Sequence, residues 1–147
     1  MIDEADALSF DKQICFSLYS AANAMVRAYR PFLNSMDLTY LQYIVMMILW
    51  EEQGISVSSL GNKLHLDSGT LTPLLKRLES KGLVNRKVSD IDERVKCLFL
   101  TDAGLALKTR ASRIPEKVLC KTSVPLASLL QLKVQCDQLL DSFDENL

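Results

Sequence analysis

The sequence predicts a mainly α-helical protein with a small β-hairpin, in which a winged helix-turn-helix lobe stands between N- and C-terminal helices. One observation is a pair of short mid-chain segments with leucines at helical spacing, joined by a tight turn. Another is the pair of alternating, strand-like segments that follows them. The third is charge: residues 1–55 contain three basic and seven acidic side chains, whereas residues 56–96 contain eight basic and five acidic ones. This asymmetry suggests a basic face, although an ordinary solvated surface is the alternative.

The length and composition of the chain favour one domain over residues 1–147. A chain of 147 residues is about one domain long, and 48% hydrophobic residues are enough to build a core. The N-terminal "MIDEADALSF" is acidic where a signal peptide is basic, and the apolar run "YIVMMILW" is too short to span a bilayer. We therefore expect a soluble cytoplasmic protein without membrane association.

The first expected element is a helix over residues 9–31, on which Cys15, Tyr19 and Tyr29 share one stripe. At 1.5 Å per residue, Cys15 and Tyr29 lie about 21 Å apart along this helix, so they cannot touch within one chain. A lone cysteine in such a stripe is often only a small buried apolar group. Tyr19 and Tyr43 are as well suited to packing as to any function.

A helix-turn-helix is predicted next. After a cap at Ser56, apolar residues have the spacing i, i+3, i+4, i+7: Val57, Leu60, Gly61 and Leu64. The spacing repeats after "HLD", between a cap at Asp67 or Ser68 and a stop at Gly82: Leu71, Leu74, Leu75 and Leu78. Pro73 falls within or just past the first turn of this second helix, where it costs little.

The face of the second helix opposite its leucines predicts contact with double-stranded DNA. It has short polar groups near its N-terminus and basic groups further on: Ser68, Thr70, Thr72, Pro73, Lys76 and Arg77. A recognition helix presents such a face to a major groove. Any amphipathic surface helix also has a polar face, so this feature alone does not decide the function.

The segments "LVNRKVS" and "RVKCLFL" alternate as strands do, and "DIDE" between them supplies a turn, so a β-hairpin is predicted. Its basic side chains are Arg86, Lys87, Arg94 and Lys96. A basic hairpin directly after a helix-turn-helix is a wing, whose tip can reach phosphates or a narrow minor groove. Cys97 alternates with Val95 and Phe99 and is expected to be a small buried hydrophobe.

The segment "DSGTLTPLLKRLESKGLVNRKVSDIDERVKCLFLTDAG" resembles the DNA-binding lobe of MarR-family transcription regulators. It contains the D-x-R wing motif of that family at Asp92 to Arg94, followed by its "LT..G". The resemblance implies a homodimer in which helices of residues 9–36 and 115–147 interlock and the lobes of residues 37–113 bind successive major grooves. It also implies that Arg94 enters the minor groove while Asp92 braces it.

Three further segments, "QICFSLYSA", "RAYRPF" and "LTYLQYIVMMILWE", resemble the organic-hydroperoxide regulators within the MarR family. The resemblance implies a repressor whose Cys15 thiolate is oxidised by an organic hydroperoxide to sulfenic acid, after which the dimer releases its operator. In an interlocked dimer, Tyr29 and Tyr40 of the partner chain could donate hydrogen bonds to this thiolate. A thiolate attacks the peroxide bond, whereas a buried neutral thiol is inert.

The remaining cysteines include no C-x-x-C pair, and His65 is the only histidine, so we expect neither a metal site nor a cofactor. Cys136 fits a helix-pairing seam and is expected to be structural. Cys120 matches the resolving cysteine of the two-cysteine branch of these regulators, and the resemblance implies an intersubunit disulfide with Cys15. An incidental surface or interface thiol is the alternative for Cys120.

Three functions are consistent with the sequence. The leading one is the peroxide-responsive repressor, with an organic hydroperoxide as inducer and a peroxide-detoxifying gene as target. The second is a MarR-type repressor that releases DNA on binding a small phenolic ligand, with Cys15 merely lining the pocket. The third is a thiol peroxidase, which we do not expect because it leaves the winged helix unexplained.

Overall fold

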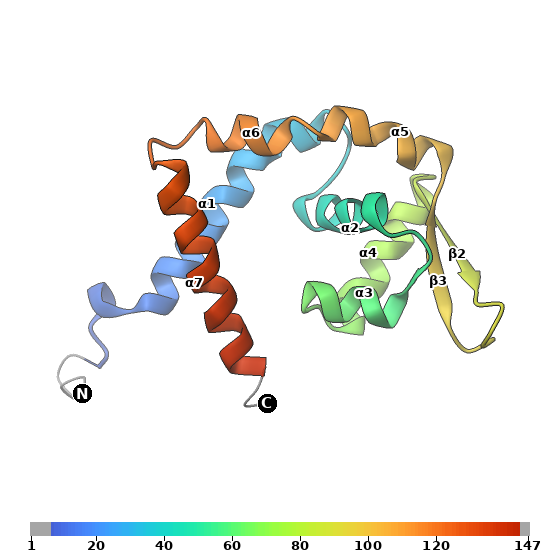
Figure 1. Cartoon of the computed structure of the whole chain (residues 1–147), viewed down its shortest axis with the longest axis horizontal. Coiled ribbons are helices and arrows are strands. Elements are labelled where there is room, and N and C mark those ends of the chain that lie inside the picture. The colour runs from blue at the N-terminus through green and yellow to red at the C-terminus, as the bar shows by residue number, and fades with distance from the viewer. Residues whose placement is uncertain (1–6, 145–147) are drawn as a thin grey trace. The chain divides into compact units, whose positions relative to one another are not determined.

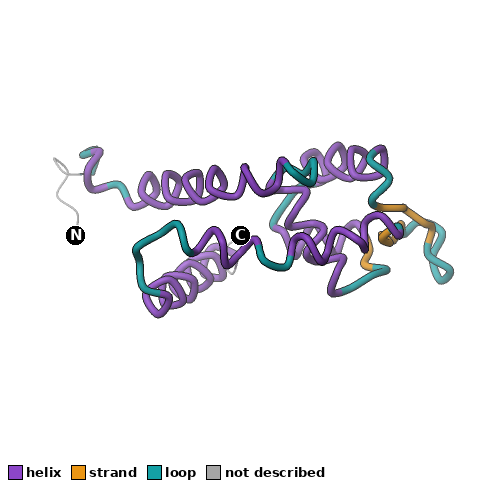
Figure 2. Tube along the Cα trace, turned by 90° about the horizontal axis from the view of Figure 1, so that it is seen from above, coloured by secondary structure: helices purple, strands orange, loops and turns teal. Residues whose placement is uncertain are grey.

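A computed structural model of the protein describes residues 7–144 (Figure 1). The chain divides into two compact units, Met1–Ile114 and Pro115–Leu147. The elements follow one another as η1 (Phe10–Lys12), α1 (Ile14–Asn34), α2 (Tyr40–Glu51), β1 (Ile55–Ser56), α3 (Val57–Leu64), α4 (Ser68–Ser80), β2 (Val84–Val88), β3 (Lys96–Leu100), α5 (Asp102–Ala111), α6 (Ile114–Leu119) and α7 (Leu126–Asp144). Helices dominate and the strands gather in one small sheet, as Figure 2 shows, which confirms the predicted fold class.

The N-terminal helix differs from its predicted bounds at both ends. Gln13 has an extended backbone (φ −83°, ψ 103°), which separates the single turn of η1 from α1. Helix α1 then accommodates Pro31 near its end and runs three residues further. It is closed where Asp37 takes a left-handed conformation (φ 52°) and the Leu38 N–H donates to the Leu33 carbonyl at 3.1 Å.

Helix α2 begins at a reciprocal capping box. The Gln42 N–H donates to Thr39 Oγ1 at 3.3 Å, and the Thr39 N–H donates to Gln42 Oε1 at 3.0 Å. The apolar side chains of α2 enter the core of the first unit, where Val45, Met46 and Leu49 are fully buried. The apolar run that is too short to cross a membrane is therefore a buried helix, and within residues 7–144 no helix is long and apolar enough for a membrane span.

The predicted helix-turn-helix is present with its predicted caps. The Ser59 N–H donates to Ser56 Oγ at the start of α3, and the Thr70 N–H donates to Asp67 Oδ1 at 2.7 Å at the start of α4. Between the helices, His65 adopts a left-handed conformation (φ 51°) that turns the chain. Pro73 lies beyond the first turn of α4, and the helix continues through it to a left-handed Gly82.

The hairpin of β2 and β3 is joined by a strand that the sequence pattern did not reveal. Strand β1 has two residues and pairs antiparallel with β3, giving the order β1-β3-β2. In β3, Leu98 and Leu100 point into the core, whereas Cys97 and Phe99 lie on the partly exposed face. The expectation that Cys97 is buried was therefore wrong: it is half-buried, because the core face of β3 belongs to the other set of alternating residues.

Helix α5 packs closely on the junction of α4 and β2. A Cβ added to Gly104 would lie 2.2 Å from the Leu83 carbonyl oxygen, which already accepts a hydrogen bond from the Thr101 N–H at 3.1 Å. The Gly104 carbonyl accepts a hydrogen bond from Trp50 Nε1 at 2.9 Å. Gly104 thus lets α5 contact both the start of the wing and the end of α2.

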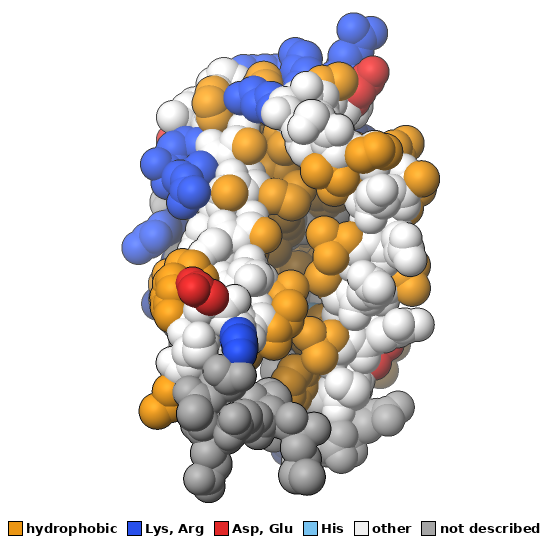
Figure 3. All heavy atoms as spheres, turned by 90° about the vertical axis from the view of Figure 1, so that its left-hand side faces the viewer, with side chains coloured by type: hydrophobic (Ala, Val, Ile, Leu, Met, Phe, Trp, Pro, Cys, Tyr) orange, Lys and Arg blue, Asp and Glu red, His pale blue; other side chains and the backbone are white. Residues whose placement is uncertain are grey.

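The unit of residues 115–147 contains most of α6 and the long helix α7. Helix α7 exposes a series of large apolar side chains: Leu126, Leu130, Leu132, Val134, Leu139, Leu140 and Phe143. Helix α1, in the other unit, also exposes apolar side chains: Ile14, Phe16, Tyr19 and Met25. Figure 3 shows a face of the molecule on which hydrophobic side chains are exposed. So much exposed apolar surface is typical of helices that bury it against another chain.

Candidate nucleic-acid interface and thiol site

The polar face of α4 is accessible along its length. Of the six α4 residues that are predicted to contact DNA, Thr72 is half-buried and the other five are exposed: Ser68, Thr70, Pro73, Lys76 and Arg77. On the opposite face, Leu71, Leu75 and Leu78 are at most 2% exposed and hold the helix against the core. The helix therefore presents short polar groups at its N-terminal end and cations further on, as a recognition helix does.

The tip of the wing is ordered by hydrogen bonds around Asp92. Asp92 Oδ1 accepts from the Arg94 backbone N–H at 2.9 Å, and its carbonyl accepts from the Val95 N–H at 3.0 Å. The Ser89 N–H donates to the Val95 carbonyl at 2.8 Å and closes the loop. Asp92 therefore fixes the backbone that presents Arg94, whose side chain is exposed.

Two cations of the hairpin have partners within the first unit. Arg86 Nη2 lies 2.8 Å from Glu79 Oε2 on α4, and both side chains are less than 30% exposed. Lys87 Nζ lies 5.3 Å from the centre of the Phe99 ring, within reach of a cation–π interaction. Arg86 therefore ties the wing to the recognition helix, and much of its charge is compensated there.

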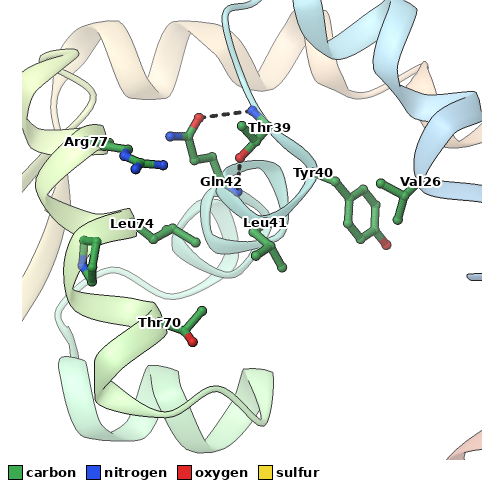
Figure 4. A pocket seen from close by; sticks show the side chains of 9 residues that line it. Val26, Thr39, Tyr40, Leu41, Gln42, Thr70, Leu74 and Arg77 are labelled. Carbon is green, nitrogen blue, oxygen red and sulfur yellow. Dashed lines mark hydrogen bonds between the residues drawn. The ribbon is translucent and has the colours of Figure 1, made fainter. Parts of the chain in front are cut away.

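A pocket of about 430 Å³ lies between α4, the start of α2 and α1 (Figure 4). Its wall is largely apolar, with Val26, Leu41, Pro73 and Leu74, and includes the Tyr40 ring. Its polar lining residues are Thr39, Gln42, Thr70 and Arg77. Three residues of the predicted DNA-binding face, Thr70, Pro73 and Arg77, therefore also line a small-molecule-sized cavity.

The two tyrosines predicted to stabilise a thiolate lie side by side within one chain. The ring centres of Tyr29, on α1, and Tyr40, on α2, are 5.2 Å apart in an edge-to-face arrangement. The Tyr43 ring lies near both, with its centre 5.7 Å from that of Tyr29 and 6.4 Å from that of Tyr40, and it also packs next to Trp50. Burial raises the pKa of Tyr43 to about 12 and also raises the pKa of Tyr29, so both phenols remain hydrogen-bond donors at neutral pH.

Cys15 is the second residue of α1 and is exposed, as is Cys120, which directly follows α6. Because α1 is continuous from Ile14 to Asn34, Cys15 and Tyr29 are separated by about 21 Å of helix. The structure thus brings Tyr29 and Tyr40 together but not Cys15 with either. Cys120 lines an apolar recess of about 410 Å³, whose other apolar residues are Leu119, Val124, Leu126 and Leu129.

Two residues of this region were not predicted from the sequence: Glu79, the partner of Arg86, and Lys81, whose ammonium contacts Asp37 and Gln42. The partners of Lys81 are 44 and 39 residues away along the chain, so no local pattern points to them. Within the described residues, no group of three His, Cys, Asp or Glu side chains is placed to hold a metal ion.

Residues 38–96 match the model of the MarR family. The chain is 39% identical to the organic hydroperoxide resistance transcriptional regulator of Bacillus subtilis (strain 168), and the match covers 99% of each chain. It is 52% identical over 113 residues to the HTH-type transcriptional regulator TtmR of Methylorubrum extorquens (strain PA1). That match covers 77% of this chain and 58% of TtmR, so the chain spans less than two thirds of that relative.

Among solved structures, the chain resembles AbfR of Staphylococcus epidermidis, with a TM-score of 0.75 and 32% identity over 92% of this chain and 93% of AbfR. Reduced AbfR bound to DNA gives a TM-score of 0.76, covering 90% of this chain and 92% of AbfR. A disulfide-formed state of AbfR gives a TM-score of 0.65, and the match covers 88% of this chain and 91% of AbfR.

Proposed function

This chain belongs to the MarR family and is a DNA-binding transcription regulator, and from that premise we propose that it is a repressor that senses organic hydroperoxides through Cys15. The observation that carries this proposal is the combination of an exposed Cys15 near the start of α1 with a packed pair of phenols, Tyr29 toward the other end of α1 and Tyr40 at the start of α2. The full-length relative from Bacillus subtilis, an organic hydroperoxide resistance regulator, supports it.

The proposal requires a homodimer. Cys15 cannot reach Tyr29 within a continuous helix, so the hydroxyl groups that meet its sulfur must come from a second chain. The exposed apolar side chains of α1 and α7 suit such an assembly, and we assign dimerisation to residues 9–36 and 115–147. Residues 37–113 then form the DNA-binding lobe of each subunit.

In the reduced dimer, α4 of each subunit occupies a major groove, and Arg77 lies at the edge of the pocket. The α4 residues near the bases and phosphates are Ser68, Thr70, Thr72, Pro73 and Lys76. The wing reaches the adjacent minor groove through Arg94, held by the loop that Asp92 orders. Lys87 supplements the phosphate contacts of the wing. Arg86, already paired with Glu79, contributes chiefly by keeping the wing attached to α4.

The sensing step is a nucleophilic displacement. The Cys15 thiolate attacks one oxygen of the hydroperoxide, an S–O bond forms, the O–O bond breaks, and the departing alkoxide takes up a proton to leave as an alcohol. Sulfur is oxidised to sulfenic acid and the peroxide is reduced. The phenol hydroxyls of Tyr29 and Tyr40 from the partner chain stabilise the thiolate before this step by donating hydrogen bonds.

In the following step, the sulfenic acid condenses with the thiol of Cys120 from the other chain, which releases water and forms an intersubunit disulfide. Closing this bond requires the two Cα atoms to approach within about 7 Å, and the helices carrying them must move accordingly. AbfR, solved in both a reduced DNA-bound state and a disulfide-formed state, is a relative in which a disulfide forms. The movement ends simultaneous binding of two half-sites.

A gel shift tests the sensing role of Cys15. Reduced protein should retard operator DNA, and treatment with cumene hydroperoxide should release it. Cys15→Ser should bind equally well and stay bound after treatment, because it retains the fold but lacks the nucleophile. If Cys15→Ser still releases DNA on treatment, Cys15 is not the sensor.

The pocket beside Tyr40 favours a second candidate function, in which a small phenolic ligand causes release. Its apolar wall and its position against α4 would allow an occupant to displace the recognition helix, and Arg77 offers a cation to an acidic group. In this case a phenolic acid should release DNA from Cys15→Ser protein as well as from the unmodified chain. The named relatives are transcription regulators rather than enzymes, so a peroxidase activity has no support from them.

A further inference from the structure

We propose that Lys81 is a positioning residue that couples the recognition helix α4 to the tyrosine pair of the thiol site. The inference rests on the proposed function in one respect, namely that Tyr29 and Tyr40 belong to the sensor. The contacts of Lys81 itself are independent of that function. They join the end of α4 to the short connection between α1 and α2.

The backbone of Lys81 is fixed to α4. It is the C-cap residue of this helix, and its N–H donates to the Arg77 carbonyl at 3.0 Å. The following residue, Gly82, is left-handed (φ 69°), and its N–H donates to the Glu79 carbonyl at 2.9 Å. These bonds close the helix end, so the base of the Lys81 side chain moves together with α4.

The ammonium group of Lys81 contacts three oxygen atoms on the α1–α2 side. It donates to the Asp37 carbonyl and to Gln42 Oε1, the latter at 3.2 Å, and lies 3.3 Å from Asp37 Oδ2. The Asp37 carboxylate is 89% exposed, so this ion pair contributes little by itself. The directional contacts are those to the carbonyl and to the Gln42 amide, and the Lys81 side chain that makes them is only 27% exposed.

The oxygen atoms that Lys81 contacts belong to residues that fix the positions of the helices bearing Tyr29 and Tyr40. Asp37 closes α1, the helix that bears Tyr29, and Gln42 caps α2 through Thr39. Tyr40 is the next residue after Thr39 and the first of α2. Gln42 is 3% exposed, so its amide cannot shift without disturbing either this cap or its contact with Lys81.

A displacement of Tyr40 on oxidation therefore moves the oxygen atoms that bind the Lys81 ammonium. Through Lys81, it also shifts the position of the end of α4. Linkage makes the effect reciprocal: operator binding, which fixes α4, must also stabilise the α1–α2 connection. Without the ammonium, Tyr40 and α4 still line the same pocket, but this direct polar connection is lost.

The first test measures the ratio of operator Kd values for hydroperoxide-treated and reduced protein. Lys81→Met keeps the length of the side chain and removes the ammonium, and it should lower this ratio by about two- to thirtyfold. Asp37→Asn should leave the ratio unchanged, because it retains the carbonyl. Lys63→Met is the matched control: it removes an equal charge from the same lobe, where Lys63 pairs with Glu52 at 2.5 Å.

The salt dependence of binding separates coupling from contact with DNA. If Lys81 bound a phosphate, Lys81→Met would reduce the slope of log K against log salt concentration by about one. The coupling role predicts an unchanged slope. An equal loss of affinity in both redox states, or a slope reduced by one with an unchanged ratio, would overturn the proposal.

The second test does not depend on peroxide. Operator DNA should slow backbone hydrogen exchange in residues 35–42 of the reduced wild-type protein, and Lys81→Met should abolish this protection while α4 remains protected. If wild-type protein ignores peroxide but shows this Lys81-dependent protection, the sensing function fails and the coupling stands. If DNA protects residues 35–42 equally in both proteins, or in neither, the coupling is wrong.

Discussion

An added Cβ at Gly104 would approach the Leu83 carbonyl oxygen to 2.2 Å and a Leu100 methyl group to 3.2 Å. Backbone atoms cannot rotate away as a side chain can, so the whole start of α5 would have to move. The contact occurs where the end of α4, the start of the wing and α5 meet. Sequence reasoning recognised this glycine only as part of a family motif, since the oxygen it accommodates is 21 residues away.

Gly104→Ala should destabilise the protein by about 1–2 kcal/mol net, because overpacking against backbone, which costs up to about 3 kcal/mol, exceeds the roughly 1 kcal/mol gained in helix propensity. Urea unfolding followed by circular dichroism measures the change. Gly69→Ala is the matched control: its nearest neighbour is a side-chain oxygen, Asp67 Oδ1 at 3.2 Å, and we expect a change within about 1 kcal/mol. Equal effects of the two substitutions would contradict the packing argument.

Tyr43 gives the protein a predictable response to alkaline pH. Burial raises its pKa to about 12, so above pH 10 the unfolded chain loses a proton that the folded chain retains. This contribution to stability is complete below about pH 10 and is lost as the pH rises to about 12. Tyr43→Phe should therefore make the fall in unfolding free energy between these pH values shallower, with Tyr29 accounting for part of the remainder.

Urea titrations at pH 8, 10 and 11 test this prediction. Tyr19→Phe serves as the control, because it removes the same hydroxyl from a side chain that is 68% exposed. Parallel pH profiles for wild type and Tyr43→Phe would show that the phenol is not the group responsible.

At the scale of elements, the wing is joined directly to α4, the proposed recognition helix. The ion pair between Arg86 and Glu79 crosses directly between them, and the backbone contacts of Asp92 hold the tip that presents Arg94. Two arginines of one hairpin thus have different surroundings: Arg86 is paired with Glu79, whereas Arg94 is exposed.

Arg94→Ala should weaken operator binding and reduce the salt slope by about one, because it removes an accessible cation at the tip of the wing. Arg86→Ala should reduce the slope by less, since Glu79 already compensates its charge, and should lower stability instead. Fluorescence anisotropy with labelled duplex over a series of KCl concentrations gives both slopes. A larger slope change for Arg86→Ala than for Arg94→Ala would reverse the assignment.

The elements with local signals were predictable. Ser56, Asp67 and Gly82 mark helix ends through contacts a few residues away, and the caps are where the sequence predicts them. Strand β1 was missed because two residues carry no alternation and pair with β3, over 40 residues later. Cys97 was assigned to the wrong face because alternation defines two faces of a strand but does not say which is buried.

At the scale of the whole molecule, the candidate sites depend on assembly. Sequence and structure agree that Cys15 and Tyr29 are distant within one chain, and no property of a monomer places them together. The sequence could therefore name the residues of the proposed sensor, whereas their arrangement in the proposed dimer depends on packing between chains.

Oxidation with an organic hydroperoxide should produce a covalent dimer on a gel run without reductant, and dithiothreitol should reverse it. Cys120→Ser should abolish the dimer, because the sulfenic acid at Cys15 then lacks its resolving thiol. Cys97→Ser and Cys136→Ser should still form it, since both of these sulfurs are half-buried whereas Cys15 and Cys120 are exposed. Mass spectrometry that finds overoxidised Cys15 beside unmodified Cys120 would establish a single-cysteine mode instead.

The position of Trp50 has an optical consequence. It is the only tryptophan of the chain, its indole N–H is bound to Gly104, and its ring lies 6.4 Å from that of Tyr43. Light absorbed by the tyrosine cluster can therefore pass to a single emitter at the junction of α2 and α5. The tryptophan emission of the protein therefore reports on this junction, and a rearrangement that moves the tyrosine cluster relative to α5 can be followed in real time without a label.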